Sequence, residues 1–365
     1  MKAAVLYSPN SRVVIEDIDI VPPKAGEVLV AISAAGICRS DLHFIKGEGI
    51  IPLPSVLGHE GAGIVEEVGT GVTRLSPGDH VILSFVPNCG RCYSCSTGNP
   101  NLCDTHGATP GTMFDGTTRL RKGTMDIYHQ GKVACFAEKA VVPESGCIPV
   151  PKSVPLEHAA LIGCSVTTGI GATLLNAQVQ PDSTVAIIGC GGVGLNIIQG
   201  SSLIKSSTII AVDIDDEKLA FSKHFGATHV VNALSEDPIN QILRLTNGQG
   251  VDYAFESYGS SHTVEVACAV VRKRGTVVVV GIAPIGIPAK IDLASLVRQE
   301  KILKGCYYGS ARCHIDMPKM INMYLAGNIN IEGLITKRYK LEQINEAYKE
   351  LDEGKIIGRG ILQID

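Results

Sequence analysis

The sequence contains no tryptophan, and aromatic residues make up only 5% of its 365 residues. It has no basic excess either, because 32 lysines and arginines are set against 36 acidic residues and the formal net charge is −4. A phosphate backbone is normally bound by a basic surface, so we expect no nucleic-acid partner. No uninterrupted apolar stretch approaches the roughly 20 residues of a membrane span, so we expect no membrane association.

Signals for secretion are also missing. The apolar run from Ala3 to Tyr7 is stopped at once by Ser8-Pro9-Asn10, which indicates a strand and not a signal peptide. We therefore predict a cytoplasmic protein. In that compartment the 12 cysteines are expected to be metal ligands or buried thiols and not disulfides.

What is present is apolar and rich in turn residues. Apolar residues make up 45% of the chain and charged residues 19%, which predicts large cores and two or three domains. Up to about residue 150, short strand-like runs alternate with glycine and proline turns, as in a partly closed β barrel. From residue 178, apolar strands alternate with helices, which predicts a parallel sheet covered on both faces.

Residues 104–134 show no clear period and carry five glycines. A segment of this length without secondary structure is uncommon in a compact domain and is usually functional. We expect a surface excursion, either at a cleft or subunit contact or as a merely tolerated insertion.

Four cysteines lie close together on a loop rich in glycine and proline, at residues 88–104. They are Cys89, Cys92, Cys95 and Cys103, with the spacing C-x2-C-x2-C-x7-C. This density predicts a structural zinc site with four thiolate ligands. Four buried thiols or two disulfides are the alternatives, and both are less typical of a cytosolic chain.

Two short runs place several reactive side chains close together in the sequence. Cys38-Arg39-Ser40-Asp41-Leu42-His43 and Gly58-His59-Glu60 contain a thiol, a hydroxyl, two imidazoles and two carboxylates. Cys38 and His59 suit Zn²⁺, which favours sulfur and nitrogen ligands. A catalytic zinc needs three protein ligands and one open position, so a third ligand must come from elsewhere in the chain.

Residues 189–194, Gly-Cys-Gly-Gly-Val-Gly, fit the pattern G-x-G-x-x-G between an expected strand and an expected helix. In that context the glycines permit a tight turn and a close approach to a pyrophosphate. Asp213 ends the next expected strand, where a carboxylate accepts hydrogen bonds from ribose and repels a 2′-phosphate. The pattern therefore predicts NAD binding in preference to NADP. A tight strand-to-helix turn without a ligand is the alternative.

Five motifs occur together in one order: GICRSDLH, GHEGAG, the cysteine lobe, GCSVTTG and GCGGVG. In this order and spacing, over essentially the whole chain, the sequence resembles the zinc-dependent medium-chain alcohol dehydrogenases. The resemblance implies a GroES-like β-barrel catalytic domain at residues 1–165, an inserted Rossmann NAD-binding domain with a doubly wound parallel sheet at 166–308, and a return to the catalytic domain at 309–365. It further implies two Zn²⁺ per subunit, NAD(H), a small alcohol or carbonyl substrate, and a homodimer or homotetramer.

The resemblance also implies roles for individual residues. Cys38, His59 and Cys164 would bind the catalytic zinc. Asp41 would orient the ligand histidine, Glu60 would lie near the metal, Ser40 would take the substrate proton and His43 would pass it to solvent. The expected cofactor contacts are Gly189, Gly191, Gly192, Val193, Gly194, Asp213, Lys218, Arg39, Thr168 and Arg359, and Phe85 is expected in the substrate pocket.

The resulting hypothesis is reversible hydride transfer between an alcohol and NAD⁺, with zinc favouring the alkoxide. A formaldehyde dehydrogenase acting on a thiol adduct is the nearest alternative. It is disfavoured because residues 47–51 lack an acidic residue at the position expected for the adduct. A polyol dehydrogenase is disfavoured because Cys164 stands where that branch commonly has a glutamate. A non-catalytic NAD- or zinc-binding protein is the alternative from a different class.

Overall fold

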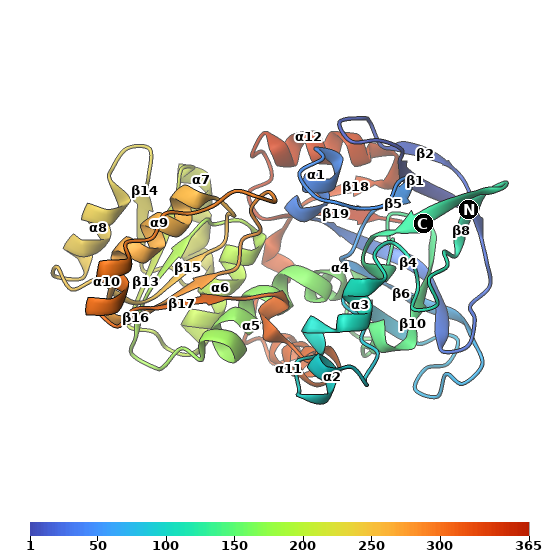
Figure 1. The fold of residues 1–365 in the computed structure, drawn as a ribbon, viewed down its shortest axis with the longest axis horizontal. Coiled ribbons are helices and arrows are strands. Elements are labelled where there is room, and N and C mark those ends of the chain that lie inside the picture. Colours follow the sequence, from blue (N-terminus) through green and yellow to red (C-terminus); the bar gives the residue numbers. More distant parts are fainter. Residues whose placement is uncertain (365) are drawn as a thin grey trace. The chain divides into compact units, whose positions relative to one another are not determined.

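The computed structural model describes residues 1–364 and divides into two compact units (Figure 1). The first unit comprises Met1–Cys164, Ala311–Gly327 and residues 331–364, and the second comprises Ser165–Ser310 with Asn328–Asn330. The chain therefore leaves the first unit and later returns to it. Residue 365, the last of the predicted return segment, lies outside the described residues.

Two sheets that share one core form the first unit. The seven-stranded sheet has the order β11-β7-β6-β4-β19-β18, and β10 also pairs with β4. Its strands are β4 (Glu27–Ile37), β6 (Gly61–Val68), β7 (His80–Leu83), β10 (Lys139–Pro143), β11 (Cys147–Pro149), β18 (Ile335–Lys340) and β19 (Arg359–Gln363). The other sheet has the order β2-β1-β5-β9-β8-β3, with β1 (Lys2–Leu6), β2 (Val14–Asp17), β3 (Asp19–Ile20), β5 (Ser55–Val56), β8 (Leu120–Lys122) and β9 (Met125–His129).

Strand β4 is the longest of this unit and pairs with three others. Val28, Val30 and Ile32 alternate toward the core and are at most 3% exposed, which is the period-2 pattern of a half-buried strand. Glycine weakens the interior of a strand, but β4 passes through Gly36 and continues to Ile37. It does so because Gly36 pairs with Ile361 of β19, a residue far away in the sequence.

Short helices complete the first unit. They are α1 (Arg39–Ile45), α2 (Tyr93–Ser96), α3 (Asp104–Ala108), α4 (Leu156–Leu161), α11 (Cys313–Leu325) and α12 (Ile344–Asp352). Helix α12 buries Ile344, Ala347 and Tyr348, the i, i+3, i+4 face of an amphipathic helix.

The prediction of a surface excursion at residues 104–134 is wrong for much of that segment. Strands β8 and β9 form a hairpin that pairs with β3 and β5, and Met113, Leu120 and Ile127 are at most 1% exposed. Arg119 is also buried and donates two hydrogen bonds to Glu27. These partners are distant in sequence, so no local period could have indicated them.

Helical structure runs from Leu156 to Ala177 through two π-helical turns, Ile162–Val166 and Ala172–Ala177. By length and composition alone this helix could cross a membrane, but 89% of its apolar window is buried within the protein, as in a core helix. The helix passes through Gly163 and Cys164 in a π turn, a feature frequently found at functional sites.

The second unit contains a six-stranded, entirely parallel sheet in the order β14-β13-β12-β15-β16-β17. Its strands are β12 (Thr184–Ile188), β13 (Thr208–Asp213), β14 (His229–Asn232), β15 (Val251–Glu256), β16 (Val271–Val279) and β17 (Ile302–Gly305). Its helices are α5 (Thr167–Gly171), α6 (Gly192–Leu203), α7 (Asp216–Ser222), α8 (Pro238–Leu245), α9 (Ser261–Val270) and α10 (Leu293–Arg298). The strand order reverses between β12 and β15, and open parallel sheets bind ligands at such a switch point.

Candidate metal and cofactor sites

Three predicted zinc ligands from distant parts of the sequence meet within the first unit. Cys38 precedes helix α1, His59 precedes strand β6, and Cys164 lies in the π turn after α4. Their ligand atoms all lie within 4.8 Å of one another, and all three residues are buried. The distance from Cys164 Sγ to His59 Nε2 is 3.4 Å. Two sulfur atoms and one nitrogen can therefore bind one cation and leave a further position open.

The electrostatics of this group favour the thiolate form of Cys38 and the protonated form of His59, whose Nε2 proton a metal would displace. The hydrogen bond from Cys164 and the positive charge of His59 outweigh burial and hold the pKa of the Cys38 thiol well below its usual range. Burial lowers the pKa of His59, but Asp41 and Cys38 outweigh it and raise that pKa to about 10. A thiolate is the form of cysteine that binds metals. The donor set therefore fits Zn²⁺, which prefers sulfur and nitrogen.

Asp41 and Ser40 lie directly beside these three residues. Asp41 Oδ1 is 2.6 Å from His59 Nδ1, so the other ring nitrogen, Nε2, is turned toward Cys164. The Ser40 hydroxyl lies 3.0 Å from Cys38 Sγ and 3.3 Å from His59 Nε2. A carboxylate in the position of Asp41 fixes the tautomer and the ring orientation of a metal-binding histidine.

His43, the second residue of the predicted proton relay, lies on helix α1 with Ser40. His43 Nδ1 is 2.5 Å from Glu48 Oε2, and the His43 side chain is partly exposed. Glu48 was not among the predicted site residues, and it anchors the imidazole. Arg39 begins α1 and is exposed.

Glu60 and Arg359 form a buried ion pair, with Arg359 Nη2 donating to Glu60 Oε2. The close approach depends on Gly36, because a Cβ atom there would overlap the Glu60 carboxylate. The two partners are 299 residues apart in sequence, so no motif contained both. In this structure the guanidinium of Arg359 thus contacts the carboxylate next to His59, and its predicted contact with a pyrophosphate remains a prediction.

Phe85, the predicted pocket residue, packs against His59. The two rings meet edge to face, with centroids 5.1 Å apart and an interplanar angle of 86°. Phe85 therefore forms an apolar wall beside a metal-binding residue.

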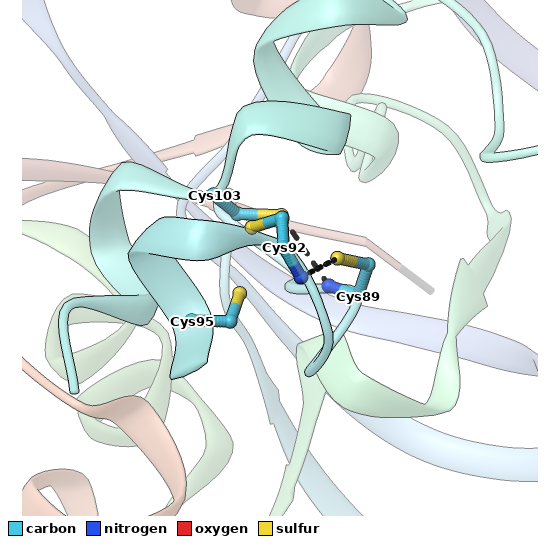
Figure 2. Close-up of side chains that lie close together, drawn as sticks. All are labelled: Cys89, Cys92, Cys95 and Cys103. Atoms are coloured by element: carbon cyan, nitrogen blue, oxygen red, sulfur yellow. Dashed lines mark hydrogen bonds between the residues drawn. The ribbon is translucent and has the colours of Figure 1, made fainter. Parts of the chain in front are cut away.

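The four lobe cysteines also come together, with their sulfur atoms within 4.8 Å of one another. Figure 2 shows the four side chains gathered around one point. Cys103 Sγ accepts hydrogen bonds from the backbone N–H groups of Cys89 and His106, at 3.3 and 3.4 Å. Burial opposes the ionised form of Cys89, but the Thr105 hydroxyl and backbone N–H groups lower its pKa to about 6. All 12 cysteines of the described chain are free, which excludes the two-disulfide alternative and fits a metal lobe.

In the second unit the glycine loop joins β12 to α6 at the switch point. Gly189 has φ 99°, a left-handed conformation that favours glycine, and a Cβ atom on Gly194 would overlap the carbonyl oxygen of Gly189. Asp213 ends β13, and its Oδ2 accepts the N–H of Cys190 at 2.7 Å. The carboxylate therefore lies beside the loop that would hold a pyrophosphate.

The remaining predicted cofactor contacts are also placed in the second unit. Gly191, Gly192 and Val193 lie at the start of α6, Lys218 lies half-buried in α7, and Thr168 is buried in α5.

Sequence reasoning missed two residues next to Asp41. Gln130 donates a hydrogen bond to Asp41, and Tyr348 of α12 is buried close to the same carboxylate. Burial and the Asp41 charge raise the pKa of Tyr348 well above its usual range, so its hydroxyl is protonated. Neither residue belongs to a motif, and only the register of β9 and the buried face of α12 could have indicated them.

Comparison with known proteins agrees with this architecture. The model of the alcohol dehydrogenase GroES-like domain matches residues 24–152, and that of the zinc-binding dehydrogenases matches residues 192–326. The chain is 39% identical over 366 residues to the NDMA-dependent alcohol dehydrogenase of Amycolatopsis methanolica, covering 99% of this chain and 98% of that protein. It is 38% identical to the S-(hydroxymethyl)glutathione dehydrogenase of Escherichia coli, with 98% of each chain covered.

A solved structure shows the same fold. The benzyl alcohol dehydrogenase of Acinetobacter calcoaceticus superposes with a TM-score of 0.94 at 33% identity, covering 100% of this chain and 99% of that one. The predicted combination of a GroES-like barrel and a Rossmann sheet is confirmed. From these relatives and from its two groups of metal-binding side chains, we conclude that the chain belongs to the zinc-dependent medium-chain alcohol dehydrogenases, enzymes that interconvert alcohols and carbonyl compounds with NAD(H).

Proposed function

We propose that Cys38, His59 and Cys164 bind the catalytic zinc of this enzyme and that Cys89, Cys92, Cys95 and Cys103 bind a structural one. The observation that supports the catalytic site best is the meeting of three buried donors from distant parts of the chain. When bound, zinc supplies Lewis acidity toward an alcohol or carbonyl oxygen, and NAD(H) supplies the hydride chemistry.

The side chains around the metal site would move the proton and set the geometry. Asp41 holds the His59 ring, and the Ser40 hydroxyl lies close enough to the donor set to take a proton from a substrate oxygen there. His43, partly exposed and held by Glu48, would release that proton to solvent. Phe85 would line the apolar side of the substrate site.

The domain assignment follows the two compact units. We propose that the first unit is the catalytic domain and that the second unit binds NAD(H) through its glycine loop. The predicted boundaries at residues 165 and 308 lie next to the ends of the second unit's main segment, Ser165–Ser310.

For the substrate we propose primary or secondary alcohols and their carbonyl products. A thiol adduct of formaldehyde is the second candidate substrate, because the E. coli relative is named as an S-(hydroxymethyl)glutathione dehydrogenase. Within residues 47–51 the one acidic side chain, Glu48, already binds His43, which disfavours that candidate. NADH formation, followed by absorbance over a panel of alcohols and over formaldehyde with and without glutathione, tests both. If the enzyme oxidises formaldehyde only in the presence of glutathione and oxidises no simple alcohol, the thiol adduct becomes the first candidate substrate.

Asp213→Gly is expected to relax the preference for NAD. The variant loses the hydrogen bonds to the ribose, which contribute about 1.5–3 kcal/mol to NAD binding. It also loses the negative charge that repels a 2′-phosphate. The ratio of kcat/KM for NADP to kcat/KM for NAD should therefore rise at least about tenfold. Steady-state kinetics with both cofactors provide the measurement. Asp216→Asn, a nearby exposed change, is the control and should leave the ratio unaltered. An unchanged ratio in Asp213→Gly would contradict the ribose assignment.

We propose a homodimer, with a homotetramer as the alternative. Strand β17 is the edge of the parallel sheet and all four of its residues are exposed. Ile302 and Leu303 lie on it, and the nearby Leu293 and Val297 of α10 are at least 70% exposed. An unpaired edge with exposed apolar side chains is a typical protein interface.

Leu303→Lys is therefore expected to shift the mass in solution to that of one chain, measured by light scattering on a sizing column. Leu234→Lys, at an equally apolar but separate exposed position, should retain the wild-type mass. A wild-type protein with the mass of one chain would refute the proposed dimer.

We propose a cytoplasmic location, supported by the 12 free cysteines of the described chain. Cell fractionation tests it, and recovery of the enzyme outside the cytoplasm would refute it.

A further inference from the structure

Gln130 connects the residue that orients His59 to the backbone that carries His59. Its Nε2 donates to Asp41 Oδ1 at 2.6 Å, and its Oε1 accepts the N–H of Gly58 at 2.6 Å. Asp41 Oδ1 is the same atom that lies 2.6 Å from His59 Nδ1, and Gly58 directly precedes His59 in the chain. One amide side chain therefore holds His59 from two directions.

The two contacts also fix which way the amide is turned. The N–H of Gly58 can only donate, so the amide oxygen must face it and the amide nitrogen must face Asp41. Asp41 Oδ1 then accepts from both Gln130 and His59 Nδ1, and the other ring nitrogen, Nε2, is directed toward Cys164. A carboxylate at Nδ1 fixes the ring orientation that a metal bound at Nε2 requires.

Burial makes these contacts strong determinants of geometry. Asp41 is 0% exposed, His59 3% and Gln130 5%, so water does not compete for their hydrogen bonds. At Oδ1, Asp41 accepts from Gln130 and faces His59 Nδ1, and the buried Tyr348 hydroxyl lies close to the same carboxylate. Gln130 is therefore a side-chain donor that holds Asp41 at the oxygen facing His59.

The backbone holds Gln130 rigidly in place. Strand β9 pairs with β5 just before it, and after it the N–H groups of Cys135 and Phe136 donate to the carbonyl groups of Gly58 and Leu57 at 3.0 and 3.1 Å. Between these two anchors, Lys132 adopts a left-handed conformation with φ 59°, which is unfavourable for a residue other than glycine. A strained turn that persists between two anchors is typical of a functional position.

We propose that Gln130 is a positioning residue for the catalytic zinc, which holds Asp41 and thereby keeps His59 Nε2 directed at the metal. The inference rests on the proposed metal site of Cys38, His59 and Cys164. It gives a specific function to the end of the segment 104–134, for which the sequence left a cleft or subunit contact and a tolerated insertion as alternatives.

The test measures zinc release from the purified holoenzyme to an excess of a chromogenic chelator. Zinc release from the wild-type protein should have two kinetic phases, one for each site. The phase that is absent from the Cys38→Ser variant belongs to the catalytic site, and the other phase belongs to the cysteine lobe. In Gln130→Met we expect the catalytic-site phase to be at least about tenfold faster and the lobe phase unchanged, since loss of such an outer partner typically costs 10–100-fold in metal affinity. Gln180→Met, an exposed amide of the second unit, is the matched control and should release zinc as the wild type does.

A folded Gln130→Met variant with the wild-type release rate would overturn this inference alone and leave the proposed function intact. If Gln130→Met does not fold, Gln130→Leu decides, because it also removes the donor toward Asp41 and introduces no charge beside that carboxylate. The same acceleration in Gln130→Leu would support the inference and an unchanged rate would refute it. A wild-type protein without a Cys38-dependent phase would refute the metal site and this inference together.

Discussion

Cys38→Ser is expected to lower turnover by at least about 10³-fold while leaving NADH binding largely intact. The variant loses one of three donors that lie within 4.8 Å of one another, and with it a Lewis acid worth several kcal/mol in the transition state. The glycine loop and Asp213 belong to the second unit, so the substitution leaves these cofactor contacts unaltered. Initial rates of NADH formation, NADH fluorescence titration and zinc content per subunit provide the three measurements.

The control for loss of a thiol is Cys268→Ser, a residue of helix α9 that belongs to neither group of metal-binding side chains. It should retain wild-type turnover and two zinc ions. Normal turnover in Cys38→Ser or in His59→Ala would show that zinc at this site takes no part in the reaction.

Cys103→Ser is expected to reduce the zinc content from two ions per subunit to one and to lower the thermal midpoint. Cys103 is the buried member of the lobe, and its sulfur accepts hydrogen bonds from two backbone N–H groups. The substitution therefore removes both a zinc ligand and contacts that hold residues 89–106 together. Structural zinc contributes up to about 10–16 kcal/mol of apparent binding free energy in small domains. If even a quarter of that is lost, the midpoint should fall by roughly 3–5 °C for a chain of this size. Calorimetry and metal analysis measure both effects.

Cys147→Ser is the matched control, since Cys147 is equally buried and outside both metal sites. It should keep both zinc ions. A Cys103→Ser protein that retained two zinc ions and the wild-type midpoint would show that the lobe is not a metal site.

The second unit was predicted well from the sequence because its strands are buried on both faces. Such strands, β12 and β15 among them, form continuous apolar runs, so the alternation of strands and helices from residue 178 was indicated locally. Helix starts were also indicated locally, since Asp215 and Ser260 cap α7 and α9 with their own side chains.

The first unit was predicted less completely, because its elements depend on partners far away in the chain. Strand β4 passes through Gly36, the helix continues through Cys164, and β8 and β9 lie in a segment that shows no period. Glycine disfavours the interior of a strand, but long-range pairing and burial outweigh such local preferences.

The sequence by itself determined the chemistry that is available: sulfur and nitrogen donors, a glycine loop and a carboxylate one strand later. These follow from residue type and short spacing, which are local properties. Only the tertiary structure decided which of these groups meet. Cys164 reaches His59 across 105 residues, Gln130 reaches Asp41 across 89 and Arg359 reaches Glu60 across 299. Such contacts depend on strand register and packing, which no short stretch of sequence contains.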